Sequence, residues 1–340
     1  MVTAVHIRRR SRSAKVRLRP SFVTPILAVI LLIGIPSGAL AQAYLPPAHT
    51  IFQGVAGQPV SNYEQATGKH PAVYQVFSAW GQWLPAIFAD AQAARARLMI
   101  HITSASGSTE MITPGQIARG GGDAWLIALN QAIASSHVIT YVRWMAEMDA
   151  NWNPYSAFNA DGSRRSADHS TTAYKAAWRR ATLILRGGSR AAIDAGLRGL
   201  HQPPLQGHGD LPAAPVAMQW VPQVAGAPDI AGNAPSDYFP GRRWVDWVGT
   251  DFYSKFPNFT GLTSFYNAFP GLPFSFGEWS MWGADDPGFV DTFFHWIGAH
   301  PRVRMLIYNQ GYGGEPFELS LYPRAAARIR AWLWGRRFPG

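Results

Sequence analysis

The sequence of 340 residues contains no cysteine. This absence excludes disulfide bonds, a catalytic thiol and a metal site built on thiolates. The length is enough for one large domain, such as an α/β barrel of about 250 residues. Any chemistry that this protein performs must therefore come from other side chains, and neither a metal nor a cofactor is expected.

Acidic residues are absent from residues 1–42, which carry seven basic side chains. The formal net charge of +10 at pH 7 comes mostly from this segment, because the rest of the chain has 23 basic against 20 acidic residues. That remainder shows no basic patch interleaved with aromatic residues. We therefore exclude a nucleic acid as the partner.

The basic segment continues into an apolar run over residues 22–35 and then into small residues over 36–41. This order is typical of a cleaved signal peptide. We predict a signal peptide over residues 1–41 and a protein that is secreted, extracellular or associated with the cell envelope. An uncleaved membrane anchor is the alternative, although the apolar run is shorter than the roughly 20 residues that span a bilayer.

Beyond this leader, apolar strands alternate with helical patterns as one domain over residues 44–340. The predicted strands are 50–55, 72–77, 97–103, 138–142, 215–221, 245–253, 273–278 and 303–309. The predicted helices include 62–68, 83–96, 171–181, 287–299 and 323–334. This alternation predicts an α/β fold, a single (β/α)8 TIM barrel with its functional residues at the C-terminal ends of the strands. An open doubly wound sheet is the alternative, but no Gly-rich phosphate loop follows the first strand.

Two of the predicted strands lead into a glutamate with aromatic neighbours. The fourth is followed by Glu147, with Arg143 before it and Trp152 after it, and the seventh ends in Glu278. A carboxylate at the mouth of a buried strand is unfavourable unless it is functional or paired. Two such carboxylates beside tryptophans are typical of a glycosidase. The alternative for each glutamate is a structural ion pair with an arginine.

The stretch from Tyr141 to Tyr155 resembles the fourth-strand motif of glycoside hydrolase family 26, the clan A group that includes β-mannanases. That motif reads Arg-x-x-His-Glu-Met-Asn-Gly-x-Trp-x-Pro-Trp, and the matching residues here are Arg143, Glu147, Met148, Trp152 and Pro154, with Tyr155 at the final aromatic position. Residues 244–253 resemble the sixth-strand pattern of the family, and residues 277–279 resemble its seventh-strand pattern. The likeness extends from about residue 50 to the C-terminus and is that of a divergent member.

The resemblance implies that Glu147 is the general acid/base and Glu278 the nucleophile, with retention at the anomeric carbon. It also implies that Tyr253 hydrogen-bonds the nucleophile and that Arg143 lies beneath it. A retaining mechanism needs two carboxyl groups about 5–5.5 Å apart, one protonated and one ionised. Glu278 beside Arg143 would stay ionised, whereas Glu147 against Trp152 would hold its proton near neutral pH.

The chain departs from the family pattern in its sugar-binding residues. Ala146 stands where the family has the histidine that precedes the acid/base, and Asp149-Ala150 replaces Asn-Gly. On the eighth strand we expect a tryptophan platform and find residues 308–310, Tyr-Asn-Gln. The catalytic pair is kept while part of the sugar-binding shell is changed.

Aromatic rings bury the flat C–H faces of sugars, so tryptophans near strand ends are candidates for substrate binding. We expect Trp152, Trp220 and Trp279 to line the cleft. Asp251 either binds a sugar hydroxyl or braces Arg143, and bracing is favoured.

Two other polar sites are expected to be structural. His101 is expected to satisfy a local hydrogen bond. Asp168 and His169 lie in a long polar loop without the spacing of a metal site, and we expect them to be solvated.

We therefore predict an exported retaining β-glycanase that hydrolyses β-mannan or a related β-glucan or xylan by double displacement. Its partner is a polysaccharide or oligosaccharide, and the protein is expected to be a monomer that meets a membrane only through an uncleaved N-terminal segment. Ala146 motivates the alternative of a non-catalytic carbohydrate-binding or cell-envelope protein on the same barrel. A third hypothesis is a membrane-tethered enzyme that acts on the producer's own exopolysaccharide.

Overall fold

The computed structural model of the protein describes residues 44–57, 59–82, 85–207 and 209–340. The predicted signal peptide over residues 1–41 lies outside this part of the chain. Among the described residues, no helix is both long and apolar enough to cross a bilayer.

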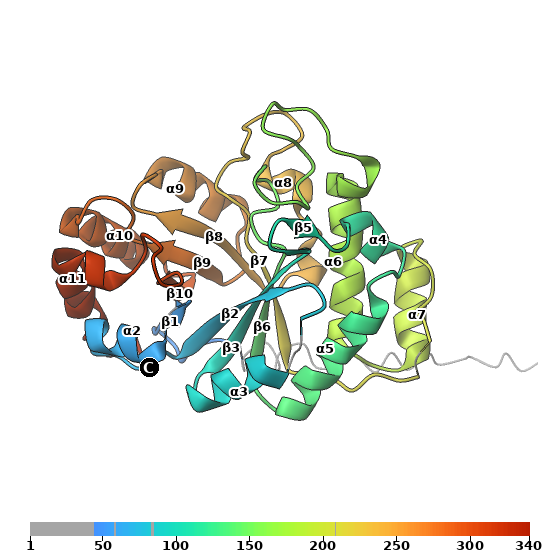
Figure 1. Cartoon of the computed structure of the whole chain (residues 1–340), viewed down its shortest axis with the longest axis horizontal. Coiled ribbons are helices and arrows are strands. Elements are labelled where there is room, and N and C mark those ends of the chain that lie inside the picture. Colours follow the sequence, from blue (N-terminus) through green and yellow to red (C-terminus); the bar gives the residue numbers. More distant parts are fainter. Residues whose placement is uncertain (1–43, 58, 83–84, 208) are drawn as a thin grey trace, which may run out of the picture. The chain divides into compact units, whose positions relative to one another are not determined.

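Eight parallel strands in the described part of the chain close into a barrel (Figure 1). They are β1 (Phe52–Ala56), β2 (Val73–Ala79), β3 (Arg97–Thr103), β6 (Thr140–Trp144), β7 (Val216–Trp220), β8 (Trp247–Tyr253), β9 (Phe274–Ser280) and β10 (Val303–Asn309). Their hydrogen-bonded order is β1-β10-β9-β8-β7-β6-β3-β2, and β2 pairs with β1 to close the ring. The predicted (β/α)8 barrel is confirmed. The short hairpin of β4 (Ala105–Ser106) and β5 (Thr109–Glu110) follows β3.

Helices surround the barrel, with α5, α6 and α7 on one side and α10 and α11 on the other (Figure 1). The helices are α2 (Val60–Thr67), α3 (Pro85–Ala93), α4 (Pro114–Ala118), α5 (Asp123–Ser136), α6 (Thr171–Arg186), α7 (Arg190–Gly199), α8 (Pro235–Tyr238), α9 (Phe259–Ala268), α10 (Pro287–Ala299) and α11 (Pro323–Leu333). The sequence did not predict α7 and α9. Each begins at a polar cap, because Ser189 and Asn258 accept backbone N–H groups of their first turns.

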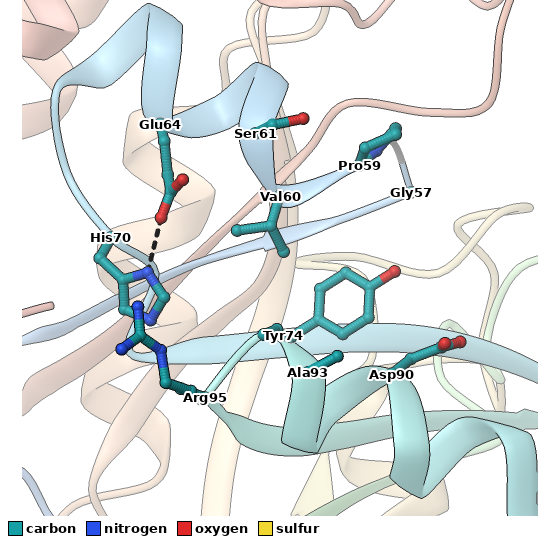
Figure 2. A pocket seen from close by; sticks show the side chains of 11 residues that line it. Gly57, Pro59, Val60, Ser61, Glu64, His70, Tyr74, Asp90, Ala93 and Arg95 are labelled. Carbon is teal, nitrogen blue, oxygen red and sulfur yellow. Dashed lines mark hydrogen bonds and ion pairs between the residues drawn. The ribbon is translucent and has the colours of Figure 1, made fainter.

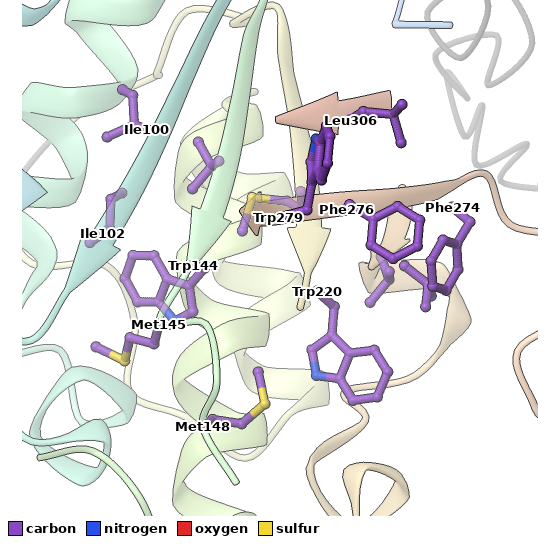
Figure 3. Close-up of a cluster of buried hydrophobic side chains, with 14 of the residues drawn as sticks. Ile100, Ile102, Trp144, Met145, Met148, Trp220, Phe274, Phe276, Trp279 and Leu306 are labelled. Carbon is purple, nitrogen blue, oxygen red and sulfur yellow. The ribbon is translucent and has the colours of Figure 1, made fainter. Parts of the chain in front are cut away.

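The strand side chains alternate between two apolar cores, as the pleat of a β-strand requires. Outward-facing side chains pack against the helices, and Figure 3 shows part of this outer core around Ile100, Trp144, Trp220, Phe276 and Leu306. Inward-facing side chains fill the barrel itself. This barrel floor consists of Tyr44, Phe52, Ala56, Val73, Met99, Tyr141, Ala217, Trp247, Met305 and Ile307.

The interior of the barrel changes from apolar to polar toward the C-terminal ends of the strands. On five strands the residue two positions beyond the floor is polar and also faces inward: Gln75, His101, Arg143, Gln219 and Asn309. Asp251 and Glu278 join them from β8 and β9. A buried polar layer at this end of a barrel marks the place where such folds carry their function.

Candidate active site

Glu278 lies in the polar layer with its carboxylate surrounded by donors. Gln75 Nε2 donates to Glu278 Oε1 at 3.3 Å, and Arg143 Nη1 donates to the same oxygen. The Tyr253 hydroxyl and Asn309 Nδ2 donate to Oε2, the latter at 3.1 Å. Four side chains of the described residues therefore direct donors at the negative charge of Glu278, a residue that is only 7% exposed.

Arg143 is the cation beneath this carboxylate. Its guanidinium pairs with both Glu278 and Asp251, and Asp251 Oδ1 accepts the backbone N–H of Glu278 at 2.8 Å. Burial disfavours the charge of Arg143, but the surrounding carboxylates of Asp251 and Glu278 raise the pKa of the guanidinium above its ordinary value. The predicted contacts of Arg143 and Tyr253 with Glu278 are therefore present, and Asp251 braces Arg143 as favoured by the sequence.

A local irregularity in β9 allows this close approach. Thr250 pairs with Phe276, but the next pair is Asp251 with Glu278, so Gly277 is left as an extra residue. A Cβ atom on Gly277 would lie 2.8 Å from Arg143 Nε and 3.1 Å from Asp251 Oδ1. Only a residue without a side chain leaves room here for the ion pair beneath the carboxylate.

Glu147 is positioned by a strained loop immediately after β6. Both Met145 and Glu147 have positive φ angles, 39° and 52°, which are unfavourable for residues with a side chain. Three hydrogen bonds hold this backbone. The N–H of Glu147 donates to Val221 O at 2.7 Å, Asn153 Nδ2 donates to Glu147 O at 2.9 Å, and the Tyr155 hydroxyl donates to the carbonyl of residue 146 at 2.6 Å. Strain maintained by its surroundings is common where a side chain must be aimed at a ligand.

The carboxyl group of Glu147 has a different environment from that of Glu278. Trp152 Nε1 donates to Oε2 at 2.8 Å, and Gln223 Nε2 donates to Oε1 at 2.5 Å. Burial raises the pKa of Glu147 above the ordinary range of a carboxyl group, and the negative charge of Glu278 raises it further. Arg143 and the Trp152 hydrogen bond oppose this rise without reversing it. The site therefore pairs a carboxylate that accepts hydrogen bonds from four side chains with a carboxyl group whose pKa is raised.

The three tryptophans that were expected to line the cleft have different environments in the structure. Trp152 is 59% exposed and stands beside Glu147, where its ring is open to a ligand. Trp220 and Trp279 belong to the core, which corrects the expectation that they line the cleft. Trp220 has no exposed surface and packs against Phe239 and Phe269, with ring centroids 5.0 and 4.9 Å away. Trp279 faces outward from β9 and stacks on Phe293 of α10 with centroids 4.7 Å apart.

Other aromatic side chains surround the site besides the three that were expected to line the cleft. Trp282 packs edge-on against Tyr253, with centroids 5.8 Å apart, and carries the exposed ring of Phe256 on its outer side. On another side of Glu278, Phe77 lies 5.4 Å from the ring of His101 and 5.9 Å from that of Tyr312.

Four further polar residues belong to the site: Gln75 and Gln223, which the sequence did not indicate, Asn309, which it indicated only as a nonspecific strand-end amide, and His101, which was expected to satisfy a local hydrogen bond. Gln75 and Asn309 contact Glu278, Gln223 contacts Glu147, and His101 accepts a hydrogen bond from Arg143 at 2.9 Å. Gln75, His101 and Asn309 lie on β2, β3 and β10, and strand alternation predicts that their side chains face inward. Amides have no distinctive sequence signal, so alternation alone could not separate them from core residues.

The loop with Asp168 and His169 is partly exposed to solvent, as expected, but both of these side chains are paired. Asp168 forms a two-pronged ion pair with Arg119 at 2.7 and 2.8 Å, and His169 Nε2 lies 2.8 Å from Glu110 Oε2. These contacts attach the loop to α4 and to the β4–β5 hairpin. Among the described residues, no group of three or more potential ligands is placed to hold a metal ion.

A separate cavity of about 550 Å³ lies on the outer side of the barrel, between α2 and α3 (Figure 2). Glu64, His70, Tyr74, Asp90 and Arg95 are among its lining residues, and His70 Nδ1 lies 2.6 Å from Glu64 Oε1. Tyr74 faces this cavity, whereas its neighbour on β2, Gln75, faces Glu278. The cavity is therefore distinct from the polar end of the barrel.

The fold and this site together define a class: a (β/α)8 barrel with two carboxyl groups in opposed environments at the C-terminal ends of its strands. No family model matches the sequence, and no curated protein matches it. Solved structures do match. Similarity to the Bacillus subtilis mannanase BCman has a TM-score of 0.54 at 15% identity and covers 88% of this chain and 89% of that one.

Two further barrels extend this comparison. A GH26A protein from a Muricauda species matches with a TM-score of 0.58 at 13% identity, over 90% of this chain and 97% of that one. The Prevotella bryantii endo-β-mannanase/endo-β-glucanase PbGH26A-GH5A matches with a TM-score of 0.52 at 11% identity, over 88% of this chain and 47% of that one. At these identities the likeness shows the fold. The Muricauda and Prevotella proteins belong to glycoside hydrolase family 26, the family whose fourth-strand motif the sequence resembles.

Proposed function

We propose that this protein is a retaining β-glycanase. The observation that carries the proposal is the pairing of two glutamates in different environments. Glu278 accepts hydrogen bonds from four side chains of the described residues, whereas the pKa of Glu147 is raised. Opposed environments of two carboxyl groups assign the roles of nucleophile and acid. The fold and the fourth-strand motif, which are shared with family 26 barrels, support the same assignment.

In the first step Glu278 attacks the anomeric carbon of the sugar while Glu147 donates its proton to the glycosidic oxygen. The glycosidic bond breaks, and a covalent glycosyl ester forms on Glu278. In the second step Glu147, now ionised, takes a proton from water, and the oxygen of that water attacks the anomeric carbon. The ester bond breaks, the sugar keeps its original configuration, and both glutamates return to their starting states.

The donors around Glu278 support both steps. Arg143 is aimed at the carboxylate that leaves when the ester is hydrolysed, so its charge stabilises the returning anion. Burial and the charge of Glu278 raise the pKa of Tyr253 well above its ordinary range, so the phenol keeps its proton and remains a donor.

The proposed substrate is a β-linked polysaccharide, β-mannan or a related β-glucan or xylan. The exposed ring of Trp152 offers a surface for the C–H face of a sugar beside the proton donor. Two of the structural neighbours, a mannanase and an endo-β-mannanase/endo-β-glucanase, support a β-linked substrate.

The test is release of reducing sugar from β-mannan, mixed-linkage glucan, xylan and bacterial exopolysaccharides. We expect release from at least one polymer, and its loss by a factor of about 10³ or more in Glu278→Ala. The matched control is Glu64→Ala, which removes a carboxylate from the cavity beside the barrel and should leave the rate unchanged. No release from any polymer would contradict the proposal.

Retention is tested on the product itself. Proton NMR of the first product should show the β-anomer before mutarotation, because two inversions restore the configuration. Azide added to Glu278→Ala should give a glycosyl azide of the opposite configuration, since it replaces the missing nucleophile. An α-anomer as the first product of the unaltered protein would exclude the double displacement.

A specific pair of observations favours a second candidate, a non-catalytic carbohydrate-binding protein. Ala146 has no polar group to offer a sugar, and four donors occupy both oxygens of Glu278, which must lose one of these bonds to attack. Such a protein would bind oligosaccharides equally well with Glu147→Gln and would release no reducing ends.

We also propose that the protein acts outside the cytoplasm, supported by the basic, apolar and small-residue order of residues 1–41. N-terminal sequencing of the protein recovered from its producer tests this. A mature N-terminus at Gln42 or Ala43 fits a cleaved signal peptide, whereas an intact N-terminus in the membrane fraction fits an anchor.

A further inference from the structure

Besides Arg143 Nε, two polar atoms beside the nucleophile have no hydrogen-bond partner among the described residues. They are Oε1 of Gln75 and Nε2 of His101, and both are buried. Buried polar atoms in folded proteins are nearly always paired, so two unpaired atoms on neighbouring strands next to a functional carboxylate require an explanation.

The hydrogen-bonding role of each atom follows from its partners. The Gln75 amide nitrogen donates to Glu278 Oε1 at 3.3 Å, which leaves the Gln75 oxygen as a free acceptor. Arg143 can only donate, so the contact of 2.9 Å between Arg143 Nη1 and His101 Nδ1 makes Nδ1 an acceptor. The proton of a neutral imidazole then resides on Nε2, which becomes a free donor.

His101 is held in this neutral form by its surroundings. Its ring packs against Phe77, and its side chain is only 16% exposed. Burial and the positive charge of Arg143 lower the pKa of His101 well below its ordinary value. A proton on Nδ1 would point at the guanidinium, so the donor stays on Nε2 at neutral pH.

A free acceptor and a free donor, both carried by residues within 4 Å of Glu278 Oε1, are complementary to sugar hydroxyls. A hydroxyl donates one proton and accepts through its lone pairs, whereas an apolar ligand or an anion could not satisfy both atoms. Ala146, in the loop after β6, offers neither group, so β2 and β3 carry the polar contacts on this side.

We propose that Gln75 and His101 bind hydroxyl groups of the sugar unit that sits against Glu278, with Gln75 accepting and His101 donating. This deepens the function proposed above and rests on it for the identity of the ligand as a sugar. It defines the substrate class as a glycan whose sugar unit at the cleavage point carries free, unsubstituted hydroxyls on the side that faces β2 and β3.

The test is a set of double-mutant cycles between protein and ligand, measured as Kd by titration calorimetry. The protein is the full chain with Glu147→Gln, which prevents turnover. The ligands are an oligosaccharide of the best polymer from the panel and analogues in which single hydroxyls of the unit at Glu278 are replaced by hydrogen. The added variants are His101→Leu and Gln75→Met, with His101→Gln as a variant that restores a donor.

We expect each removal to weaken binding of the parent oligosaccharide by about tenfold, the loss of one well-paired hydrogen bond. For each of the two residues, one deoxy analogue should lack the hydroxyl that this residue binds. Substitution of the residue should cause no further loss of affinity for that analogue. His101→Gln should recover part of the affinity. The matched control is His70→Leu in the outer cavity between α2 and α3, a histidine that contacts Glu64 and lies away from the polar layer, and it should leave the affinity for every analogue unchanged.

The proposal would be overturned if the losses of affinity from His101→Leu and Gln75→Met multiplied with the loss from every analogue. It would also be overturned if no oligosaccharide bound. If His101→Leu does not fold, the cycles with Gln75→Met and His101→Gln decide the question. Turnover by the unaltered chain is measured separately. If the protein has no turnover but the substitutions and the deoxy analogues show coupled effects on Kd, the proposed enzyme is rejected and the hydroxyl contacts are kept. If it has turnover but the effects on Kd are independent, the enzyme is kept and the hydroxyl contacts are rejected.

Discussion

The indole nitrogen of Trp152 lies 2.8 Å from Oε2 of Glu147, and most of the ring remains exposed. One side chain therefore offers an apolar face to a ligand and a hydrogen bond to the proposed proton donor. The two roles can be separated by substitution, because phenylalanine keeps the face and removes the bond.

For Trp152→Phe we expect the alkaline limb of the pH profile of kcat/KM to move to higher pH. The hydrogen bond from Trp152 favours ionised Glu147, so its loss raises the pKa of Glu147 and keeps the acid protonated over a wider range. Trp152→Ala should in addition raise KM roughly tenfold by removing the stacking surface. A limb that stays in place or moves to lower pH in Trp152→Phe would contradict the assignment of Glu147 as the acid.

The mutual influence of the two glutamates predicts a second titration effect. In Glu278→Gln the pKa of Glu147 should fall, because the negative charge that raises it has been removed. Carbon-13 NMR of labelled glutamate side chains measures this directly, with the resonance assigned by Glu147→Gln. Glu64→Gln, at the outer cavity, is the control and should leave the titration of Glu147 unchanged.

Gly277→Ala tests the close approach beneath the nucleophile. The added Cβ would lie 2.8 Å from Arg143 Nε, so Arg143 and Asp251 must move away. We expect the free energy of unfolding to fall by about 1–3 kcal/mol, and kcat to fall as Glu278 loses its ion pair. Gly199→Ala at the end of α7 is the matched control, since its Cβ meets nothing within 4 Å. Equal effects of the two substitutions would show that the crowding at Gly277 is unimportant.

The buried carboxyl group of Asp149 is expected to make the stability of the folded protein depend on pH. It has no exposed surface, Oδ1 accepts the N–H of Gln223 at 3.0 Å, and Oδ2 has no partner within the described chain. Burial raises the pKa of Asp149 well above its ordinary value, so the folded state holds the proton more tightly than the unfolded state. This contribution to stability is present at low pH and is lost as the pH rises above the ordinary aspartate range.

Asp149→Asn removes the titration while keeping an acceptor for Gln223. We expect a higher Tm than that of the unaltered protein at pH 7, and a difference that shrinks as the pH is lowered toward about 3.9, the ordinary aspartate pKa, below which Asp149 is protonated in both states. Thermal melts across this range measure it. A Tm difference that grows on acidification would reverse the sign and refute a protonated Asp149.

Much of the fold was predictable because the physical cause is local. β3, β10 and α10 have the boundaries that apolar runs and a proline at the first helical turn predicted. Helices α7 and α9 were not predicted, because their apolar periodicity is short and each begins at a single polar cap. For the same reason Glu147 and Glu278 could be found: each is a charged residue next to an apolar strand, where its presence is conspicuous.

The sequence by itself determined the alternation of strands and helices, the two glutamates at strand ends and the arginine four residues before one of them. Only the tertiary structure decided which aromatic rings face the site and which amides contact the carboxylates. Trp152 and Trp220 are chemically identical, but one stands on a loop and the other is enclosed by three phenylalanines. Burial and pairing are properties of segments brought together from distant parts of the chain, and no local pattern encodes them.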